Sequence, residues 1–259
     1  MGILEGKRGL IVGVANERSI AWHIAQHAVE QGAECAFSFL PGEKMEGRVR
    51  KTLNSGGLED AWTFPCDVSS DEDLDRLFDA LSDHFSSLDF VVHSVAYADR
   101  EYLQPGTFAA TPRSVFAQAL DISAYTLIAI ASRAKPLMKN GGSILGLSYY
   151  GAEKAAAGYN VMGVAKSALE STSRYLAAEL GEYGIRVNCL SAGPCRTLSA
   201  MAVGGIDVIL KKVEAVAPLR RNINTSEVGK AAVYLLSDLS SGVTGETHHV
   251  DAGYNAIVT

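Results

Sequence analysis

A tyrosine and a lysine, Tyr159 and Lys166, lie seven residues apart in the run YNVMGVAK. Seven steps of about 100° make about two full helical turns, so both side chains would share one face of a helix. Apolar residues recur at helical spacing along residues 159–181, and this pattern predicts the helix. A neighbouring ammonium favours the phenolate and eases proton transfer from the phenol. The pair therefore predicts an acid-base site, although, taken alone, a surface helix that happens to bear both residues is the better explanation.

The composition is that of a folded domain without nucleic-acid or membrane features. The chain has 259 residues, of which 47% are apolar and 20% charged, enough for a full core. A net charge of −6 without a long basic run argues against nucleic acid as a partner. We find no uninterrupted apolar stretch of about 18 residues and no signal peptide, and therefore expect a cytoplasmic protein that does not bind membranes. The four cysteines lack the paired spacing of a metal site, so we expect reduced thiols and no metal.

Short apolar runs alternate with longer amphipathic stretches along the whole chain. This alternation predicts one Rossmann-type α/β domain over residues 1–259, with a doubly wound, seven-stranded parallel sheet and helices on both faces. The predicted strands are residues 9–12, 34–39, 61–64, 90–95, 143–147, 185–190 and 247–250. The predicted helices lie near residues 19–31, 44–55, 70–85, 112–138, 159–181, 206–215 and 225–237.

The segment 193–216 is the least defined part of this pattern. Gly193-Pro194 and Gly204-Gly205 bracket a run of small residues there. Such a segment is either a flap that covers the substrate or a loop with a short helix, and composition alone slightly favours the loop.

The turn after the first strand, Gly13-Val-Ala-Asn-Glu-Arg-Ser19-Ile20-Ala21, has features of a dinucleotide site. It lacks the common GxGxxG pattern, but it has one glycine for a tight turn and a serine at the start of a helix. Backbone N–H groups at that helix start would hold a pyrophosphate, and Ser19 would cap the helix or bind the ligand. An ordinary strand–loop–helix turn capped by serine explains these residues about as well.

Several such motifs occur together in a characteristic order. They are Gly13-x5-Ser19-x-Ala21, Asp67-Val68, Ser94-Val95-Ala96, Leu147-Ser148-Tyr149, Tyr159-x6-Lys166, Ala192-Gly193-Pro194 and Val250-Asp251-Ala252-Gly253. This order resembles the bacterial enoyl-acyl-carrier-protein reductases, a divergent branch of the short-chain dehydrogenase/reductase superfamily. The likeness runs from about residue 2 to about residue 255, and SYYGAEKAAAGYNVMGVAK with RVNCLSAGPCRT is its most specific part.

The resemblance implies reduction of the 2,3 double bond of an acyl thioester on acyl carrier protein, in fatty-acid elongation, with NADH or NADPH as the reductant. Tyr159 would donate to the developing enolate oxygen, where a donor has its largest effect. Lys166 would hold the nicotinamide ribose hydroxyls. Tyr149 matches a second active-site tyrosine, with hydrogen bonding or shaping of the pocket as its role; a purely structural role is nearly as well supported. A homotetramer is also implied.

The resemblance also implies the cofactor-binding residues, position by position. Gly13, Ser19 and Ile20 would contact the pyrophosphate and adjacent sugar, Asp67 and Val68 the adenine, Ser94 and Ala96 the adenosine and ribose, and Thr197 the nicotinamide side. Asp251 is expected to be structural.

This chain departs from the family pattern in several places. Ala96 stands where glycine is frequent, and Cys195 stands where a branched aliphatic residue is usual. No arginine directly follows Phe39, so a 2′-phosphate lacks an obvious bidentate partner. Lys44 and Arg48 are near enough in sequence to reach it, but we expect NADH rather than NADPH. The helix after Gly204-Gly205 also begins without the basic residues common in relatives, which leaves the docking site of the carrier protein open.

Two other functions are compatible with this fold. A carbonyl or alcohol dehydrogenase of the same superfamily would need a lysine four residues after the tyrosine, where this chain has Gly163. It would also need a catalytic serine before the tyrosine, a position that Ser148 approaches. A non-catalytic nucleotide-sensing protein would retain the fold and the cofactor without turnover, since fold does not fix function; the intact Tyr159 and Lys166 count against it.

Overall fold

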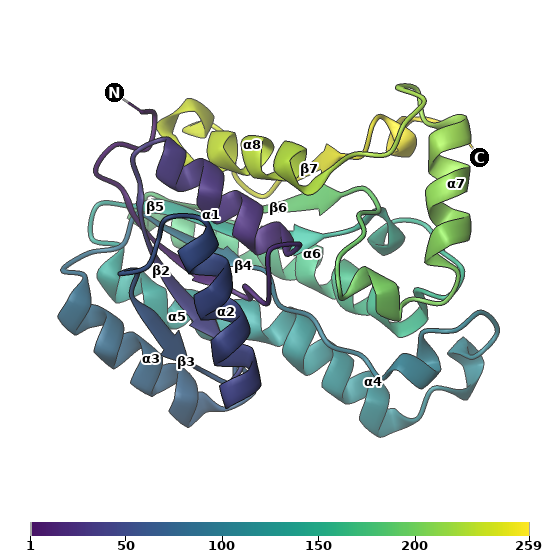
Figure 1. Ribbon diagram of the computed structural model, residues 1–259, viewed down its shortest axis with the longest axis horizontal. Helices are drawn as coiled ribbons and strands as arrows, with labels where there is room; N and C mark the ends of the chain where they lie inside the picture. The colour runs from purple at the N-terminus through teal and green to yellow at the C-terminus, as the bar shows by residue number, and fades with distance from the viewer. Residues whose placement is uncertain (1, 259) are drawn as a thin grey trace.

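The computed structural model describes residues 2–258, in which one seven-stranded sheet is covered by helices (Figure 1). The strands are β1 (Arg8–Val12), β2 (Glu34–Phe39), β3 (Thr63–Pro65), β4 (Phe90–His93), β5 (Gly142–Ser148), β6 (Ile185–Ala192) and β7 (Thr247–Val250). The helices are α1 (Ile20–Glu30), α2 (Glu43–Ser55), α3 (Asp71–His84), α4 (Arg113–Leu120), α5 (Thr126–Ala134), α6 (Asn160–Leu180), α7 (Ile206–Val216) and α8 (Thr225–Leu236). All strand pairs are parallel, as predicted, and the strand order is β3-β2-β1-β4-β5-β6-β7.

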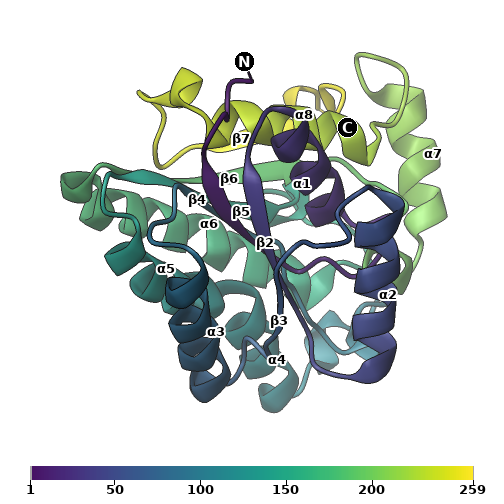
Figure 2. The ribbon, with the colours of Figure 1, turned by 60° about the vertical axis from the view of Figure 1, so that its left-hand side comes forward.

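Two apolar cores lie on opposite faces of the sheet. Alternate residues of a strand point to opposite faces, so Leu10 and Val12 of β1 enter one core and Ile11 enters the other. The first core lies under α3, α5 and α6, and the second under α1, α2 and α8 (Figure 2). This arrangement confirms the predicted doubly wound fold and explains why the strands are apolar throughout.

The chain adds β2 and β3 on one side of β1 and then crosses over to add β4 on the other side. Strands β1 and β4 are therefore neighbours, although β2 and β3 intervene in sequence. In open parallel sheets, ligands bind outside the carboxyl ends of the strands at such a point. Gly13 follows β1 directly and Ser94 follows β4, so the fold brings both predicted cofactor residues there.

The helical stretch predicted near residues 112–138 is present, but it is not regular throughout. A π-helical turn, Asp121–Tyr125, separates α4 from α5. Ser123 lies in this turn and clamps the backbone of Tyr97, accepting from its N–H at 3.0 Å and donating to its C=O at 3.2 Å. Turns of this kind are frequent at functional sites, and this one fixes the segment after β4. The third strand comprises Thr63–Pro65, so it begins two residues later than the predicted strand, residues 61–64, and is one residue shorter.

The helical run Arg113–Leu137 is long and apolar enough to cross a membrane, judged by length and composition alone. Its most apolar window has a mean hydropathy of 1.5, and 44% of that window is buried inside the domain. This run corrects our expectation that the sequence has no apolar stretch of about 18 residues. The core helix of a soluble protein satisfies the same criteria, and α5 packs against α3 and α6.

Candidate active site

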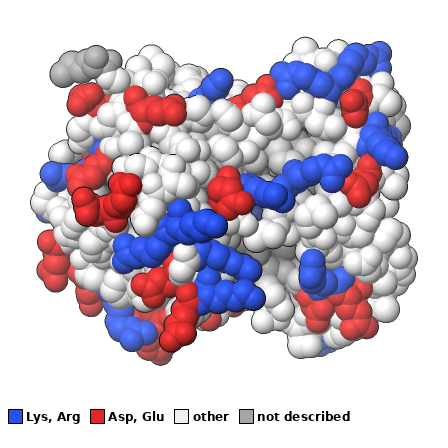
Figure 3. Space-filling view, in the orientation of Figure 1, with Lys and Arg blue, Asp and Glu red and all other residues white. Residues whose placement is uncertain are grey.

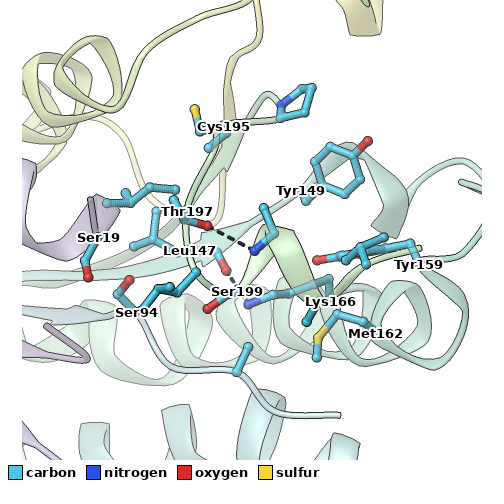
Figure 4. A pocket seen from close by; sticks show the side chains of 18 of the residues that line it. Ser19, Ser94, Leu147, Tyr149, Tyr159, Met162, Lys166, Cys195, Thr197 and Ser199 are labelled. Atoms are coloured by element: carbon cyan, nitrogen blue, oxygen red, sulfur yellow. Dashed lines mark hydrogen bonds between the residues drawn. The ribbon is translucent and has the colours of Figure 1, made fainter. Parts of the chain in front are cut away.

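A cavity of about 790 Å³ opens at the carboxyl ends of β1, β4, β5 and β6 (Figure 4). The segments that follow these four strands all contribute to its wall. Of the residues predicted from sequence, the cavity wall contains Gly13, Ser19, Ile20, Ser94, Ala96, Tyr149, Tyr159, Lys166 and Thr197. The fold therefore brings together in one place residues that are separated by up to 184 positions between Gly13 and Thr197.

The turn after β1 fits a pyrophosphate. Gly13 has φ +108°, and a Cβ at this position would lie 2.2 Å from the carbonyl oxygen of Ser94, so only glycine is accommodated. Ser19 precedes α1 but does not cap it; its Oγ instead accepts from the N–H groups of Ala15 and Asn16, both at 3.1 Å. The first N–H groups of α1 are therefore left uncapped by any side chain, and they can receive an anionic ligand.

Tyr159 and Lys166 both line the cavity, as their spacing predicts. Tyr159 is the residue immediately before α6, and Lys166 lies two turns further along that helix. Lys166 is 6% exposed, and its Nζ donates to the carbonyl oxygen of Leu147 at the end of β5, at 2.6 Å. Figure 4 shows both side chains directed into the same part of the cavity.

The phenol of Tyr159 stays neutral beside the ammonium of Lys166. Burial raises the pKa of the phenol far above its ordinary value, and Tyr149 and Glu170 raise it further. Lys166 donates to Leu147 rather than to the phenol, and burial lowers the pKa of this lysine to about 8, against smaller opposing effects of Cys189 and Glu170. At neutral pH Tyr159 is therefore a neutral hydrogen-bond donor beside a buried ammonium.

Tyr149 completes this corner of the cavity. Its ring meets that of Tyr159 edge to face, with centroids 4.8 Å apart and an interplanar angle of 73°. Burial raises the pKa of Tyr149 to about 12, so it too is a neutral phenol. Gly151 is required behind the pair, because a Cβ there would lie 2.5 Å from the ring of Tyr159.

Asp67 and Val68 lie outside the wall of this cavity. They follow β3, at the far edge of the sheet, where Asp67 Oδ1 accepts from the backbone N–H and the hydroxyl of Ser69 at 3.0 and 2.7 Å. Val68 packs against the apolar core. The assignment of these residues to the adenine therefore stays a prediction. Asp251 is structural as expected: it is 5% exposed, and its oxygens accept from the N–H groups of Gly253 and Asn255.

The segment 193–216 forms the wall of the cavity opposite Lys166. It contains a short 3-10 turn, Ala200–Ala202, and α7, and it is anchored where the N–H of Gly204 donates to the carbonyl oxygen of Leu103 at 2.8 Å. Thr197 lies here, and its Oγ1 accepts from the N–H of Ala200. Cys195 lines the cavity as a small buried side chain, and burial raises the pKa of its thiol to about 12, so it is no reactive thiolate.

Basic side chains gather over α2, beside a hollow in this face of the molecule (Figure 3). Met45, in the first turn of α2, lines the cavity. Lys44 and Arg48 are exposed neighbours of it, and Arg48 lies three residues further along the same helix. Glu43 begins the helix, so an acidic and two basic side chains lie close to this lining residue, Met45, along α2.

Sequence reasoning did not identify several residues of the site. The apolar wall comes from separate segments and includes Leu103, Met162, Val203, Ile206 and Ile209. Behind the cavity wall, His93 is fully buried at the end of β4, and its Nε2 is hydrogen-bonded to the hydroxyl of Thr126, the first residue of α5, at 2.8 Å. Burial lowers its pKa to about 3, so it is neutral. A polar residue at the end of an otherwise apolar strand was the available signal for His93; the apolar wall gave none.

Comparisons with known proteins agree with this geometry. A family model described as "Enoyl-(Acyl carrier protein) reductase" matches residues 13–255. The chain belongs to this family.

Its relatives are similar over nearly their full length. The enoyl-[acyl-carrier-protein] reductase [NADH] 1 of Rhizobium meliloti is 50% identical, covering 99% of this chain and 93% of that protein. The enoyl-[acyl-carrier-protein] reductase [NADH] FabI of a Nostoc species is 49% identical, covering 97% of each chain. The Bacillus cereus reductase, solved with NADP⁺ and indole naphthyridinone, has a TM-score of 0.96 at 46% identity, with 100% of both chains covered. The Anaplasma phagocytophilum reductase, solved with NAD, has a TM-score of 0.93 at 48% identity, with 100% of this chain and 95% of that chain covered.

Proposed function

We propose that this chain reduces the 2,3 double bond of trans-2-enoyl thioesters on acyl carrier protein with NADH, in fatty-acid elongation. The observation that supports it most strongly is the continuity of one cavity. It runs from the glycine turn and uncapped helix start at Gly13–Ser19 to Tyr159 and Lys166. NADH bound along this path supplies the reducing hydride to the β-carbon of the substrate.

Tyr159 is proposed as the donor to the thioester oxygen. Negative charge develops on that oxygen as the double bond is reduced, and a donor that is already in place stabilises it. The phenol is neutral and its proton is held tightly, because burial raises its pKa. It therefore acts as a hydrogen-bond donor rather than by ionising before the reaction. Tyr149 holds the ring from its edge, and its own hydroxyl is directed away from that of Tyr159 (Figure 4).

Lys166 is proposed to orient the cofactor. An ammonium has three N–H donors, and one of them is bonded to the carbonyl oxygen of Leu147. The other two are available to the ribose hydroxyls on the nicotinamide side. The positive charge of the ammonium also stabilises the negative charge that develops nearby during the reduction.

A carbonyl dehydrogenase is the less well supported alternative. In that reaction a serine hydroxyl would polarise the carbonyl, and Ser148 is the nearest candidate. Its hydroxyl donates to the carboxylate of Glu170 at 2.5 Å, and the residue is 6% exposed. Ser148 lines the cavity beside Tyr149, but its hydroxyl is already used in this hydrogen bond.

We further propose that the segment 193–216 is a flap that covers the acyl chain. Its contribution to the cavity is mostly apolar and includes Leu198, Val203, Ile206 and Ile209. Burial of methylene groups against such a wall is favourable by about 0.8 kcal/mol for each CH₂. The carrier protein would remain outside, with only its thioester arm in the cavity.

A cytoplasmic homotetramer is proposed as the assembly. Large apolar side chains remain exposed on α4, the π-helical turn, α5 and α6, including Phe116, Tyr125, Ile128 and Tyr175. Exposed apolar groups of this kind mark interfaces between copies, and such an interface would cover the apolar run Arg113–Leu137 without a membrane. The four free, buried cysteines fit a reducing compartment. Light scattering should give four times the chain mass of 27.5 kDa; a monomer at micromolar concentration would refute the tetramer.

The reaction is tested by following NADH oxidation with crotonyl thioester and, in parallel, with acetoacetyl thioester. We expect turnover with crotonyl thioester alone. Turnover of acetoacetyl thioester, with none of crotonyl thioester, would identify a carbonyl reductase. NADH binding without turnover of either thioester would favour the nucleotide-sensing alternative.

A further inference from the structure

Two buried groups of opposite charge lie one turn apart on α6, and consecutive residues of β5 hold them. Lys166 donates to the carbonyl oxygen of Leu147 at 2.6 Å, and Glu170 Oε1 accepts from the hydroxyl of Ser148 at 2.5 Å. Lys166 is 6% and Glu170 7% exposed. Lysine and glutamate are seldom buried to this extent unless they are paired.

Among residues 2–258, neither Lys166 nor Glu170 forms an ion pair within 4.0 Å. Both are hydrogen-bonded to neutral groups, Leu147 and Ser148, and they lie one helical turn apart on α6, where opposite charges attract. A carboxylate at this position favours the ammonium form of Lys166, and Glu170 does raise the pKa of that lysine.

The other titratable groups around Glu170 come from several elements. They are Arg174 on α6, Glu153 after the turn that follows β5, His249 on β7, Cys189 on β6 and Tyr159 before α6. His249 is bound to Glu153 at 2.7 Å, and Arg174 is exposed. The thiol and the phenol are neutral, because burial raises the pKa of each. Burial raises the pKa of Glu170, and Ser148, His249 and Arg174 oppose this rise. Lys166 is the buried cation one turn away on α6.

We propose that Glu170 is a positioning residue for the reduction: held by Ser148, its carboxylate is the buried counter-charge that keeps Lys166 protonated in the cavity. The inference depends on the proposed role of Lys166. Glu170 contacts neither substrate nor cofactor, and it acts only through that lysine. It also explains Ser148, whose hydroxyl fixes the carboxylate rather than polarising a carbonyl.

The test is E170Q, compared with wild type by two measurements. Glutamine keeps the shape and an acceptor for Ser148 but removes the charge. The first measurement is an NMR titration of lysine labelled with ¹³C at Cε, in the protein without cofactor, with K166M used to assign the signal. We expect the pKa of Lys166 to fall by about half a unit or more. The second is the pH profile of kcat/KM, whose alkaline limb should move to lower pH by the same amount.

Two further variants separate charge from folding. E179Q removes a charge from an exposed position on the same helix and should leave both measurements unchanged. S148A removes the hydrogen bond but keeps the carboxylate, and should shift the pKa of Lys166 less than E170Q does. An unchanged pKa of Lys166 in folded E170Q, or an equal shift in E179Q, would overturn the proposal. Because the titration needs no turnover, this result is distinct from failure of the proposed reaction.

Discussion

The two walls of the cavity are built in opposite ways. On the strand side, Lys166 is 6% exposed and bonded to the backbone of β5, and Tyr159 is packed against Tyr149. On the flap side, Leu198 is 49% and Met201 50% exposed. The strand-side wall is part of the domain core, whereas the proposed flap leaves these two apolar side chains about half exposed, although its N–H at Gly204 is bonded to Leu103.

This difference indicates that the two walls have different functions in the reaction. Groups that stabilise charge must be fixed before the reaction, because preorganisation is the source of their effect. A wall that contacts an acyl chain of variable length needs apolar area more than a fixed geometry. Substitutions on the strand side should therefore affect chemistry, and those on the flap should affect substrate binding.

The largest effect is expected from Tyr159→Phe, which removes the proposed oxyanion donor. One such donor is worth about 3 kcal/mol, or on the order of a hundredfold in kcat. The apparent KM should change less, because the hydrogen bond strengthens only as charge develops. Steady-state kinetics of Y159F, Y149F and the double variant test this, because donation by Tyr149 could partly replace that of Tyr159. An unchanged kcat in all three would remove the tyrosines from the mechanism.

The next largest effect is the loss of activity in alkaline solution. Burial lowers the pKa of Lys166 to about 8, so the lysine is protonated below this pH and neutral above it. Activity that needs the ammonium is present below pH 8 and should fall about tenfold for each unit above it. The profile of kcat/KM reports this group in the free enzyme. A flat profile to about pH 10, near the ordinary pKa of lysine, would show that the charge of Lys166 is not needed or that its pKa is normal.

Cofactor choice should show an intermediate effect. A 2′-phosphate must be paired or it remains partly desolvated and unmatched, and the start of α2 offers Glu43 before any basic residue. We expect kcat/KM to favour NADH over NADPH by about tenfold or more, which corresponds to about 1.4 kcal/mol. Glu43→Arg should shift the ratio toward NADPH. Equal efficiency in the unmodified enzyme would mean that Lys44 or Arg48 reaches the phosphate.

The smallest effect is expected on the flap surface. Arg196 and Asp207 form an ion pair at 2.8 Å, with both side chains more than 60% exposed. Exposed pairs contribute about 0–1 kcal/mol, so Asp207→Asn should change the apparent KM for the thioester by less than about fivefold and leave kcat unchanged. A large fall in kcat would show that the flap contributes to the chemistry, and the contrast between the two walls would fail.

The sequence predicted the strand-side wall better than the flap side for a physical reason. Helical spacing joins Tyr159 to Lys166, and each parallel strand delivers the residue after it to the same edge of the sheet. The contacts of Leu103 and Ile206 depend on how distant loops fold over the cavity, which local patterns do not encode. Spacing gives proximity but not burial, and burial dominates the pKa of Tyr159, so the spacing alone could not predict how strongly the neutral phenol is favoured.

The most direct test of the central claim is the position of the transferred atom. The chain is incubated with crotonyl thioester and with NADH that has deuterium on the reactive carbon of its nicotinamide ring. Mass spectrometry and NMR of the product should find a saturated butyryl thioester with one deuterium at the β-carbon. A product that retains the double bond, or deuterium found only on a carbon that bears a hydroxyl group, would contradict the assignment of this site to enoyl reduction.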